Sequence, residues 1–148
     1  MKRLFALCAV AALMFASTFT SRAEAADRAY SEGPVSVVSS IRTKPGMFDE
    51  YLKWLAGSWK QGMEAEKAAG VILGYAVYSA TPRGPDDADL YLVTTYKNMA
   101  ALDGLDAKTD PIYEKLMGSQ QQQSEAAIAR GKMRTVIGDE LIREMVLK

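Results

Sequence analysis

The sequence predicts one small α+β domain whose strands and helices follow the order βαββαβ. Apolar residues at spacings of three and four define a long helix over residues 47–69. Two segments rich in Val, Tyr and Thr, residues 71–81 and 89–97, are separated by a short loop of Pro, Gly and Asp, which is typical of an antiparallel hairpin. Further β-type segments, residues 35–43 and 140–147, stand at either end, and the length of 148 residues fits one domain.

The first 25 residues are expected to form a secretory signal peptide that is absent from the folded domain. Two basic residues precede an apolar run over residues 4–19, and residues 23–25 (Ala-Glu-Ala) offer small side chains at the positions that signal peptidase reads. Cleavage is therefore expected before Ala26, with the mature protein periplasmic or secreted. The run of about 16 residues is shorter than the about 20 that span a bilayer, so a retained membrane anchor is the weaker alternative.

The residue types in the chain exclude several chemistries. Cys8 is the only cysteine and leaves with the signal peptide, so the mature chain has no disulfide and no thiol nucleophile. The bulky Leu7 before it does not fit a lipoprotein signal. The sequence contains no histidine, which excludes Ser-His-Asp and Cys-His catalysis, His-ligated haem and the common zinc sites. We therefore expect no metal site and no cofactor.

The charge distribution argues against nucleic-acid and membrane partners. Of 18 basic and 18 acidic residues, Lys2, Arg3, Arg22 and Glu24 belong to the signal peptide, which leaves a net charge of −2. No basic stretch dominates the remainder, as a nucleic-acid interface requires. No helix is basic and amphipathic enough to bind a membrane surface after cleavage.

The long helix presents one apolar face and has clear ends. Pro45-Gly46 separates it from the first strand, and Gly70 occupies the position where a helix C-cap is expected. The apolar face of the helix is made by Phe48, Leu52, Leu55, Trp59 and Met63.

Residues 26–34 are polar and end in Gly-Pro, which predicts a flexible N-terminal arm before a domain over residues 35–148.

The second helical region is predicted in two parts. Asn98 caps a short helix, and Asp110-Pro111 starts a longer one that continues to about Lys132, bent or broken at Gly118. Residues 140–147 are predicted as the last strand, and a continuation of the helix is the alternative.

Elements in this order build a ferredoxin-like domain, in which a four-stranded antiparallel sheet carries both helical regions on one face. If the other face met water, each strand would alternate between apolar and polar residues. In the second strand, however, Tyr75 and Val77 alternate with Ala76 and Tyr78, so both faces are apolar. We expect a second copy to cover the helix-free face, giving a homodimer through the sheets. Folding of the N-terminal arm over the sheet is the alternative.

The segment Lys44-Pro45-Gly46-Met47-Phe48-Asp49-Glu50-Tyr51, which leads from a strand into the long helix, resembles the start of dimeric α/β-barrel domains. That superfamily includes antibiotic-biosynthesis-type monooxygenases, EthD-like proteins and stress-responsive barrel proteins. The segments 74–75, 89–92 and 96–99 are similar to those of uncharacterised exported bacterial members. The resemblance covers residues 35–147 and implies a dimeric barrel with a cavity between sheet and helices. Members that bind or degrade haem, or dismutate chlorite, use a histidine, so that function does not carry over.

Tyrosines of the predicted hairpin suit the walls of the implied cavity, which would be mostly apolar with a few polar groups. Tyr75, Tyr78, Tyr91 and Tyr96 combine aromatic rings with hydroxyl tips. The alternative is that these four residues belong to the core or to the dimer interface.

The two tryptophans occupy different positions on the long helix. Trp59 belongs to its apolar face and is expected in the core, and a place in the wall of the ligand pocket is the alternative. Trp54 lies off that face, which indicates a place at an interface, at a pocket rim or on the surface.

Two charged residues fall among apolar neighbours. Glu66 lies about five helical turns after Phe48 and therefore on the same face. It is either a buried base with a raised pKa or a surface carboxylate paired with a Lys or Arg. Arg143, in the apolar last strand, needs an anionic partner, from the other subunit or from a ligand. The loop aspartates lack EF-hand spacing and predict a solvated turn: Asp86, Asp87 and Asp89.

We therefore expect an exported small-molecule-binding or non-catalytic homodimer, with an apolar small molecule as its ligand. One alternative is a cofactor-independent, monooxygenase-like enzyme for an apolar or aromatic molecule, which needs a closed pocket with a buried ionisable group. The other is a structural or interaction protein of the cell envelope, which needs a large exposed apolar patch.

Overall fold

The structure is a computed structural model and describes residues 28–148. The expected signal peptide and its cleavage site before Ala26 lie outside these residues. Strands and helices follow the predicted order βαββαβ, with each helical region divided into parts. The elements are β1 (Tyr30–Thr43), α1 (Phe48–Trp54), the π-helical η1 (Leu55–Trp59), α2 (Lys60–Ala68), β2 (Gly74–Ser79), β3 (Leu90–Tyr96), the 3₁₀ helix η2 (Met99–Leu102), α3 (Leu105–Met117), α4 (Gln120–Gly131) and β4 (Arg134–Leu147).

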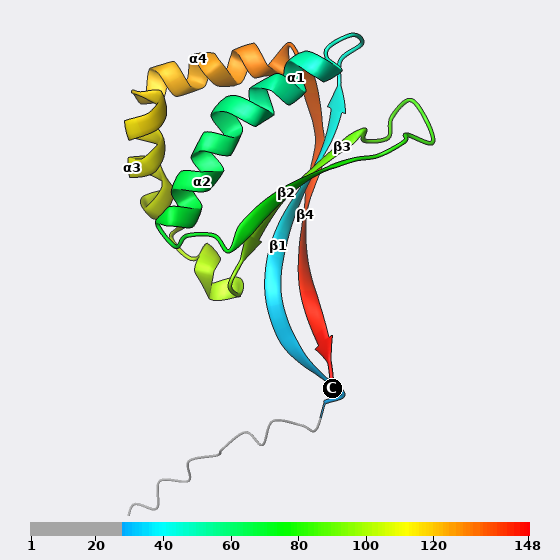
Figure 1. Ribbon diagram of the computed structural model, residues 1–148, viewed down its shortest axis with the longest axis vertical. Helices are drawn as coiled ribbons and strands as arrows, with labels where there is room; N and C mark the ends of the chain where they lie inside the picture. Colours follow the sequence, from blue (N-terminus) through cyan, green and yellow to red (C-terminus); the bar gives the residue numbers. More distant parts are fainter. Residues whose placement is uncertain (1–27) are drawn as a thin grey trace, which may run out of the picture.

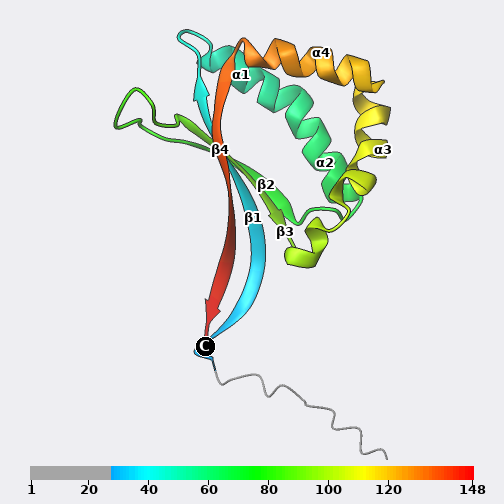
Figure 2. The same cartoon turned by 180° about the vertical axis from the view of Figure 1, so that it is seen from behind.

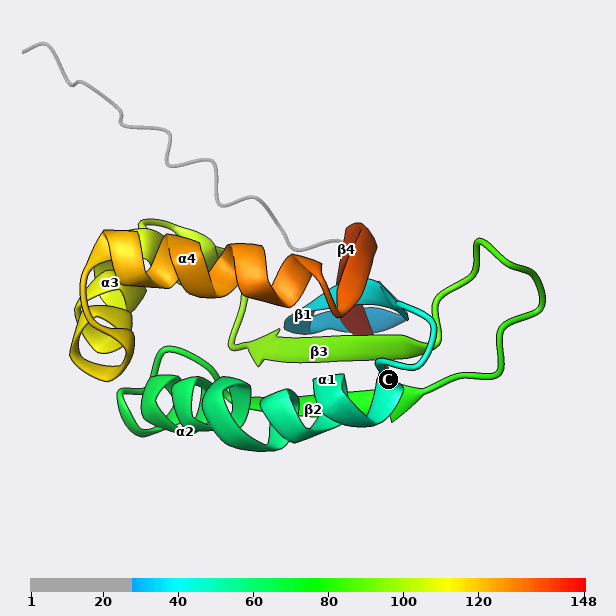
Figure 3. The same ribbon diagram turned by 90° about the horizontal axis from the view of Figure 1, so that it is seen from above.

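The strands form one antiparallel sheet in the order β2-β3-β1-β4, and the fold is α+β. The helices lie together on one side of this sheet, which leaves its other face free of helices (Figures 1 and 2). From above, α1 and α2 form one row and α4 a second, with α3 at one end between them (Figure 3). The predicted four-stranded antiparallel sheet with helices on one face is therefore confirmed.

The predicted flexible arm is wrong for residues 30–34, because β1 begins at Tyr30. This part of β1 pairs with the end of β4, from Tyr30 opposite Leu147 to Glu32 opposite Met145. The register shifts between Glu32 and Val35, so the Gly-Pro pair forms an irregularity inside the strand and does not end it. This segment extends away from the helices as a two-stranded ribbon (Figure 1), and it does not fold over the sheet.

The last strand and the second helical region also differ from their predicted bounds. β4 begins at Arg134, because the β-favouring residues after it pair with the end of β1, where Thr43 lies opposite Arg134. α3 begins at Leu105, after Gly104 in a left-handed conformation (φ 60°), and not at Asp110. The predicted break at Gly118 is present, and the Ser119 hydroxyl caps α4 beyond it.

The core lies between the sheet and the row of α1 and α2. One cluster of buried residues joins Tyr51 and Leu55 of the helix to Ile41, Leu90 and Leu92 of the sheet. A second cluster is made by Val35, Met63, Ile72 and Tyr96, and Trp59 packs against both clusters. Strand β4 is covered less well, and several of its apolar side chains are exposed: Val136, Ile137, Leu141, Ile142, Met145, Val146 and Leu147.

Candidate ligand-binding cavity

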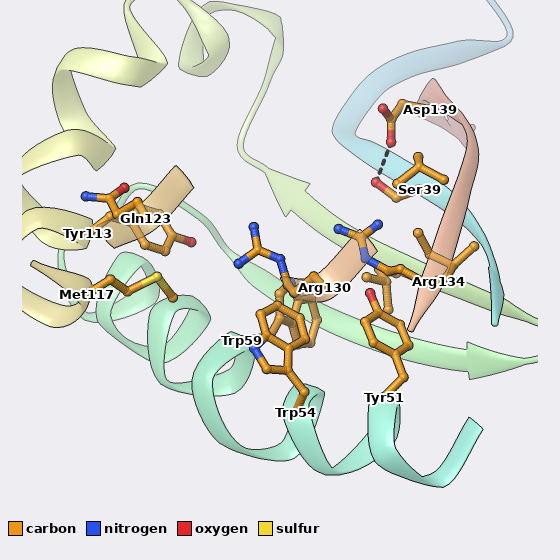
Figure 4. A pocket seen from close by; sticks show the side chains of 13 residues that line it. Ser39, Tyr51, Trp54, Trp59, Tyr113, Met117, Gln123, Arg130, Arg134 and Asp139 are labelled. Carbon is orange, nitrogen blue, oxygen red and sulfur yellow. Dashed lines mark hydrogen bonds between the residues drawn. The ribbon is translucent and has the colours of Figure 1, made fainter. Parts of the chain in front are cut away.

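A cavity of about 390 Å³ opens between α1, the end of α4 and the helix-covered face of the sheet (Figure 4). This volume is within the range of small-molecule sites, about 300–1,000 Å³. The cavity has an aromatic side, a cationic side and an apolar end. Its lining residues are Ser39, Ile41, Tyr51, Trp54, Trp59, Leu92, Tyr113, Met117, Gln123, Arg130, Arg134, Val136 and Asp139.

The aromatic side depends on the π-helical turn between α1 and α2. Trp54 and Trp59 are five residues apart, and in a regular α-helix this spacing places side chains on different faces. The π-helical segment Leu55–Trp59 widens the turn to a spacing of five, so both indole rings reach the same cavity. Tyr51, one turn before Trp54, stacks on it with ring centres 5.7 Å apart and an angle of 8° between the planes.

The cationic side comes from the junction of the last helix and the last strand. Arg130 lies in the last turn of α4 and Arg134 is the first residue of β4. The Arg130 guanidinium lies 4.9 Å from the ring centre of Trp54, and that of Arg134 lies 5.5 Å from the ring centre of Tyr51. Figure 4 shows these four side chains pointing toward one another. Each guanidinium therefore lies over an aromatic face, which is favourable for a cation. An aromatic ring, however, supplies no oxygen acceptor for the N–H groups of the guanidinium.

Three donors beside this cavity are buried and have no hydrogen-bond partner among residues 28–148. They are the Nε atoms of Arg130 and Arg134 and the hydroxyl of Tyr51, whose side chain is fully buried. Within residues 28–148 neither arginine takes part in an ion pair. Buried donors are rarely left unsatisfied in proteins, so each of these three atoms calls for an acceptor.

The cavity lining carries more positive than negative charge, with two arginines and one aspartate. Burial and the neighbouring Arg134 charge lower the pKa of Arg130. Burial raises the pKa of the Tyr51 hydroxyl, and the two arginines act in the opposite direction. Asp139 is the one acidic residue in the lining, and its carboxylate accepts a 2.5 Å hydrogen bond from the Ser39 hydroxyl.

Glu66 is a buried carboxylate behind the cavity wall. Its side chain is 4% exposed, and its Oε1 accepts a 2.6 Å hydrogen bond from the hydroxyl of Tyr113, which lines the cavity. Burial raises the pKa of Glu66, and the Tyr113 hydrogen bond lowers it in part. Of the two sequence interpretations, the buried carboxylate with a raised pKa is therefore correct. The surface ion pair is wrong, because the last turn of α2 packs against α3.

The hairpin tyrosines do not line the cavity. Tyr75 faces the helices, contacts Trp59 edge-on with ring centres 5.2 Å apart and donates a hydrogen bond to Glu64. Tyr96 is buried in the core. Tyr78 and Tyr91 lie opposite each other in the sheet, on the helix-free face, and Tyr78 is 58% exposed. The predicted tyrosine-lined cavity is wrong because strand alternation sends these two side chains to the other face.

Arg143 has its anionic partner within the same chain. Its Nη1 lies 2.6 Å from Oε2 of Glu32 on the neighbouring strand β1. The predicted partner from another subunit or a ligand is therefore not needed. The sequence interpretation missed this pair because it assigned Glu32 to the flexible arm.

Among the lining residues that were not identified from the sequence, four carry aromatic or cationic groups of the cavity: Tyr51, Tyr113, Arg130 and Arg134. Tyr51 comes one residue before Leu52 of the predicted apolar face, and the helical spacing gave no reason to single it out. Arg130 and Arg134 look like solvated residues at a helix end, because the turn that brings both side chains over α1 has no signature in the sequence.

Within residues 28–148 the structure contains neither a membrane-spanning helix nor a cluster of metal ligands. None of the helices within residues 28–148 has the length and apolarity needed to cross a bilayer. In the same part of the chain, no three acidic side chains come together in a way that would hold a metal ion.

Comparisons with known proteins do not assign the chain to a family. No protein-family model matches it, and no curated protein is significantly similar to it. Among solved structures, the crystal structure of HapK from Hahella chejuensis is 12% identical, with a TM-score of 0.49, and the match covers 74% of this chain and 91% of that chain. This degree of likeness indicates neither a function nor a ligand.

Proposed function

We propose that this protein binds a small molecule in the cavity between α1, α4 and the sheet. The observation that carries the proposal is the set of three buried donors without partners, those of Arg130, Arg134 and Tyr51. Such donors beside an open cavity of about 390 Å³ match the usual composition of ligand sites, in which apolar walls surround a few convergent polar groups.

The proposed assembly is a homodimer of ferredoxin-like domains, arranged as a dimeric α/β barrel. The strand order β2-β3-β1-β4 with helices on one side is compatible with that fold. The helix-free face supports the dimer, because Tyr78, Tyr91 and Val93 form an apolar centre there and Ile142, on β4, is 50% exposed. A second sheet placed against this face would remove these side chains from water.

The proposed location is the periplasm or the exterior of the cell. This part of the proposal is supported by the N-terminal sequence alone, in which a basic start, an apolar run and Ala-Glu-Ala occur in the order of a signal peptide.

Native mass spectrometry of protein purified from its own periplasm tests the proposal. We expect a dimer of chains that begin at Ala26, and a retained small molecule that is released when the sample is denatured. A monomer of unprocessed chains with no added mass would contradict the assembly and the export. If exhaustive extraction yields no small molecule and no added compound shifts the mass, the binding function is wrong.

A second candidate is a cofactor-independent enzyme, and the Glu66–Tyr113 pair favours it. Tyr113 lines the cavity, and its hydroxyl donates to a buried carboxyl whose pKa is raised by burial. A protonatable group in contact with a cavity residue is what general acid–base chemistry requires. Turnover that is lost in Tyr113→Phe while ligand affinity is kept would support the enzyme over the binding protein.

A further inference from the structure

We infer that the ligand of this cavity is an aromatic monocarboxylate, whose carboxylate accepts from Arg130, Arg134 and Tyr51. This inference rests on the proposed binding function and specifies its ligand. It follows from the charge of the lining, the geometry of the donors and the character of the opposite end of the cavity.

The charge of the lining favours one negative charge on the ligand. Arg130 and Arg134 are both charged, because a guanidinium is not deprotonated in proteins. Asp139 is the one acidic lining residue, and it lies on the exposed strand β4, hydrogen-bonded to Ser39. The lining therefore carries a net charge of +1, and a monoanion brings it to zero.

The donors match a carboxylate group. A guanidinium presents N–H groups in a planar fork that complements a carboxylate, and the bond is strengthened by the charges. The two oxygens of a carboxylate accept about four hydrogen bonds, enough for both guanidinium groups and the Tyr51 hydroxyl. A neutral amide at this position would bring two donors of its own toward the arginines.

The opposite end of the cavity accommodates a flat apolar body. Away from the arginines the lining includes Tyr113 and Met117, with Gln123 beside them (Figure 4). Aromatic rings pack well on such surfaces, and the Met sulfur adds a favourable contact at a ring edge. Inorganic phosphate has no apolar surface to contact these side chains, and as a dianion it exceeds the net charge of the lining.

Isothermal titration calorimetry with naphthalene-2-carboxylate and naphthalene-2-carboxamide tests the inference on the full processed protein. The two probes share the ring and differ in charge. We expect the carboxylate to bind at least 10-fold more tightly than the carboxamide, and inorganic phosphate to bind more weakly than either. Arg134→Gln should reduce the preference for the carboxylate several-fold, because Arg130 and Tyr51 remain.

Two further variants separate a loss of recognition from a loss of folding. Tyr51→Phe keeps the stacked ring and removes only the hydroxyl, so we expect a several-fold loss of carboxylate affinity and little change for the carboxamide. Arg143→Gln is the matched control, because Arg143 is paired with Glu32 away from this cavity, and it should keep the full preference.

The outcomes distinguish the inference from the proposed function beneath it. Equal binding of the two naphthalene probes would overturn the carboxylate inference and leave the binding function intact. Tighter binding of phosphate would overturn the aromatic part. If neither naphthalene probe binds the wild type, the aromatic monocarboxylate inference is wrong, and the binding function is then decided by the extraction and native mass spectrometry described above.

Discussion

Glu66 illustrates how a single buried group couples this structure to pH. Its carboxyl is almost entirely buried and has Tyr113 as its hydrogen-bond donor. Burial penalises the ionised form, so the pKa of the folded state lies above the usual value of 4.5. The folded protein therefore holds a proton at pH values where the unfolded chain has released it, and its stability falls as pH rises through this interval.

We predict that Glu66→Gln removes this pH dependence. An amide can still accept from Tyr113 and carries no charge at any pH. The free energy of unfolding, measured in urea from pH 4 to pH 8, should decline with rising pH in the wild type relative to the variant. Tyr113→Phe removes the bond that lowers the pKa of Glu66, so its decline should extend to higher pH. Parallel curves for wild type and Glu66→Gln would refute this reading.

We also predict that Arg134→Met stabilises the unliganded protein. The buried Nε without a partner costs about 1–3 kcal/mol, whereas the contact with the Tyr51 ring is worth about 0.5–1 kcal/mol. A net gain of about 1 kcal/mol corresponds to a rise of about 4 °C in Tm for a domain of this size. Calorimetric unfolding without ligand checks this, and a lower Tm in Arg134→Met would show that the arginine already has a stabilising partner.

Sequence reasoning located single residues well where one regular element decided their position. The spacing placed Glu66 on the apolar face of the long helix and left burial and a surface ion pair both open, and the structure buries it. Arg130 and Arg134 were not predicted as cavity residues. They reach α1 only because the turn between α4 and β4, far away in the sequence, packs beside it. Tyr78 and Tyr91 were misplaced because the face that each strand turns toward the helices depends on the pairing register, which the sequence of one strand does not contain.

At the scale of elements, the π-helical turn is the feature that assembles the cavity. Helical periodicity predicted the full length of the region from Met47 to Ala69, and it treated that region as one regular helix. The π-helical segment Leu55–Trp59 breaks this period and brings Trp54 to the side of Trp59. Two glycines lie in this region. Gly62 packs closely against Tyr113, whereas Gly57 has open space around it.

We predict opposite effects for alanine at these two glycines. A Cβ on Gly62 would lie 2.8 Å from Cε1 of Tyr113, so Gly62→Ala should displace that ring and cost about 1–3 kcal/mol. Nothing lies within 4 Å of a Cβ on Gly57, so Gly57→Ala should gain up to about 1 kcal/mol from helix propensity. Urea unfolding of both variants tests this, and similar effects at the two positions would contradict the close packing of α2 on α3.

The boundaries of strands were harder to predict than their existence. The hairpin strands were found within a few residues of their observed ends, because loop residues mark both sides. β1 and β4 are longer than predicted, because the two strands pair with each other beyond their predicted ends. Pairing between the two ends of the chain is a tertiary effect, and local propensity does not include it.

At the scale of the whole molecule, the helix-free face of the sheet is the surface that the proposed dimer would cover. We predict that Tyr91→Asp gives a monomer in sedimentation velocity experiments, because it would bury a charge at the centre of that face. Ile128→Asp is the matched control, since Ile128 is 70% exposed on α4, and it should keep the wild-type mass. A Tyr91→Asp protein that sediments like the wild type would rule out this interface.

The cavity is formed by segments from the beginning and the end of the domain, and this affects where in the cell a ligand can be bound. The aromatic surface comes from the first helix, and both guanidinium groups come from the junction before the final strand. If the proposed export carries the polypeptide through the membrane unfolded, this site closes only after β4 has paired with β1. The occupant would then be acquired outside the cytoplasm, from whatever the surrounding compartment offers, and would not travel with the nascent protein.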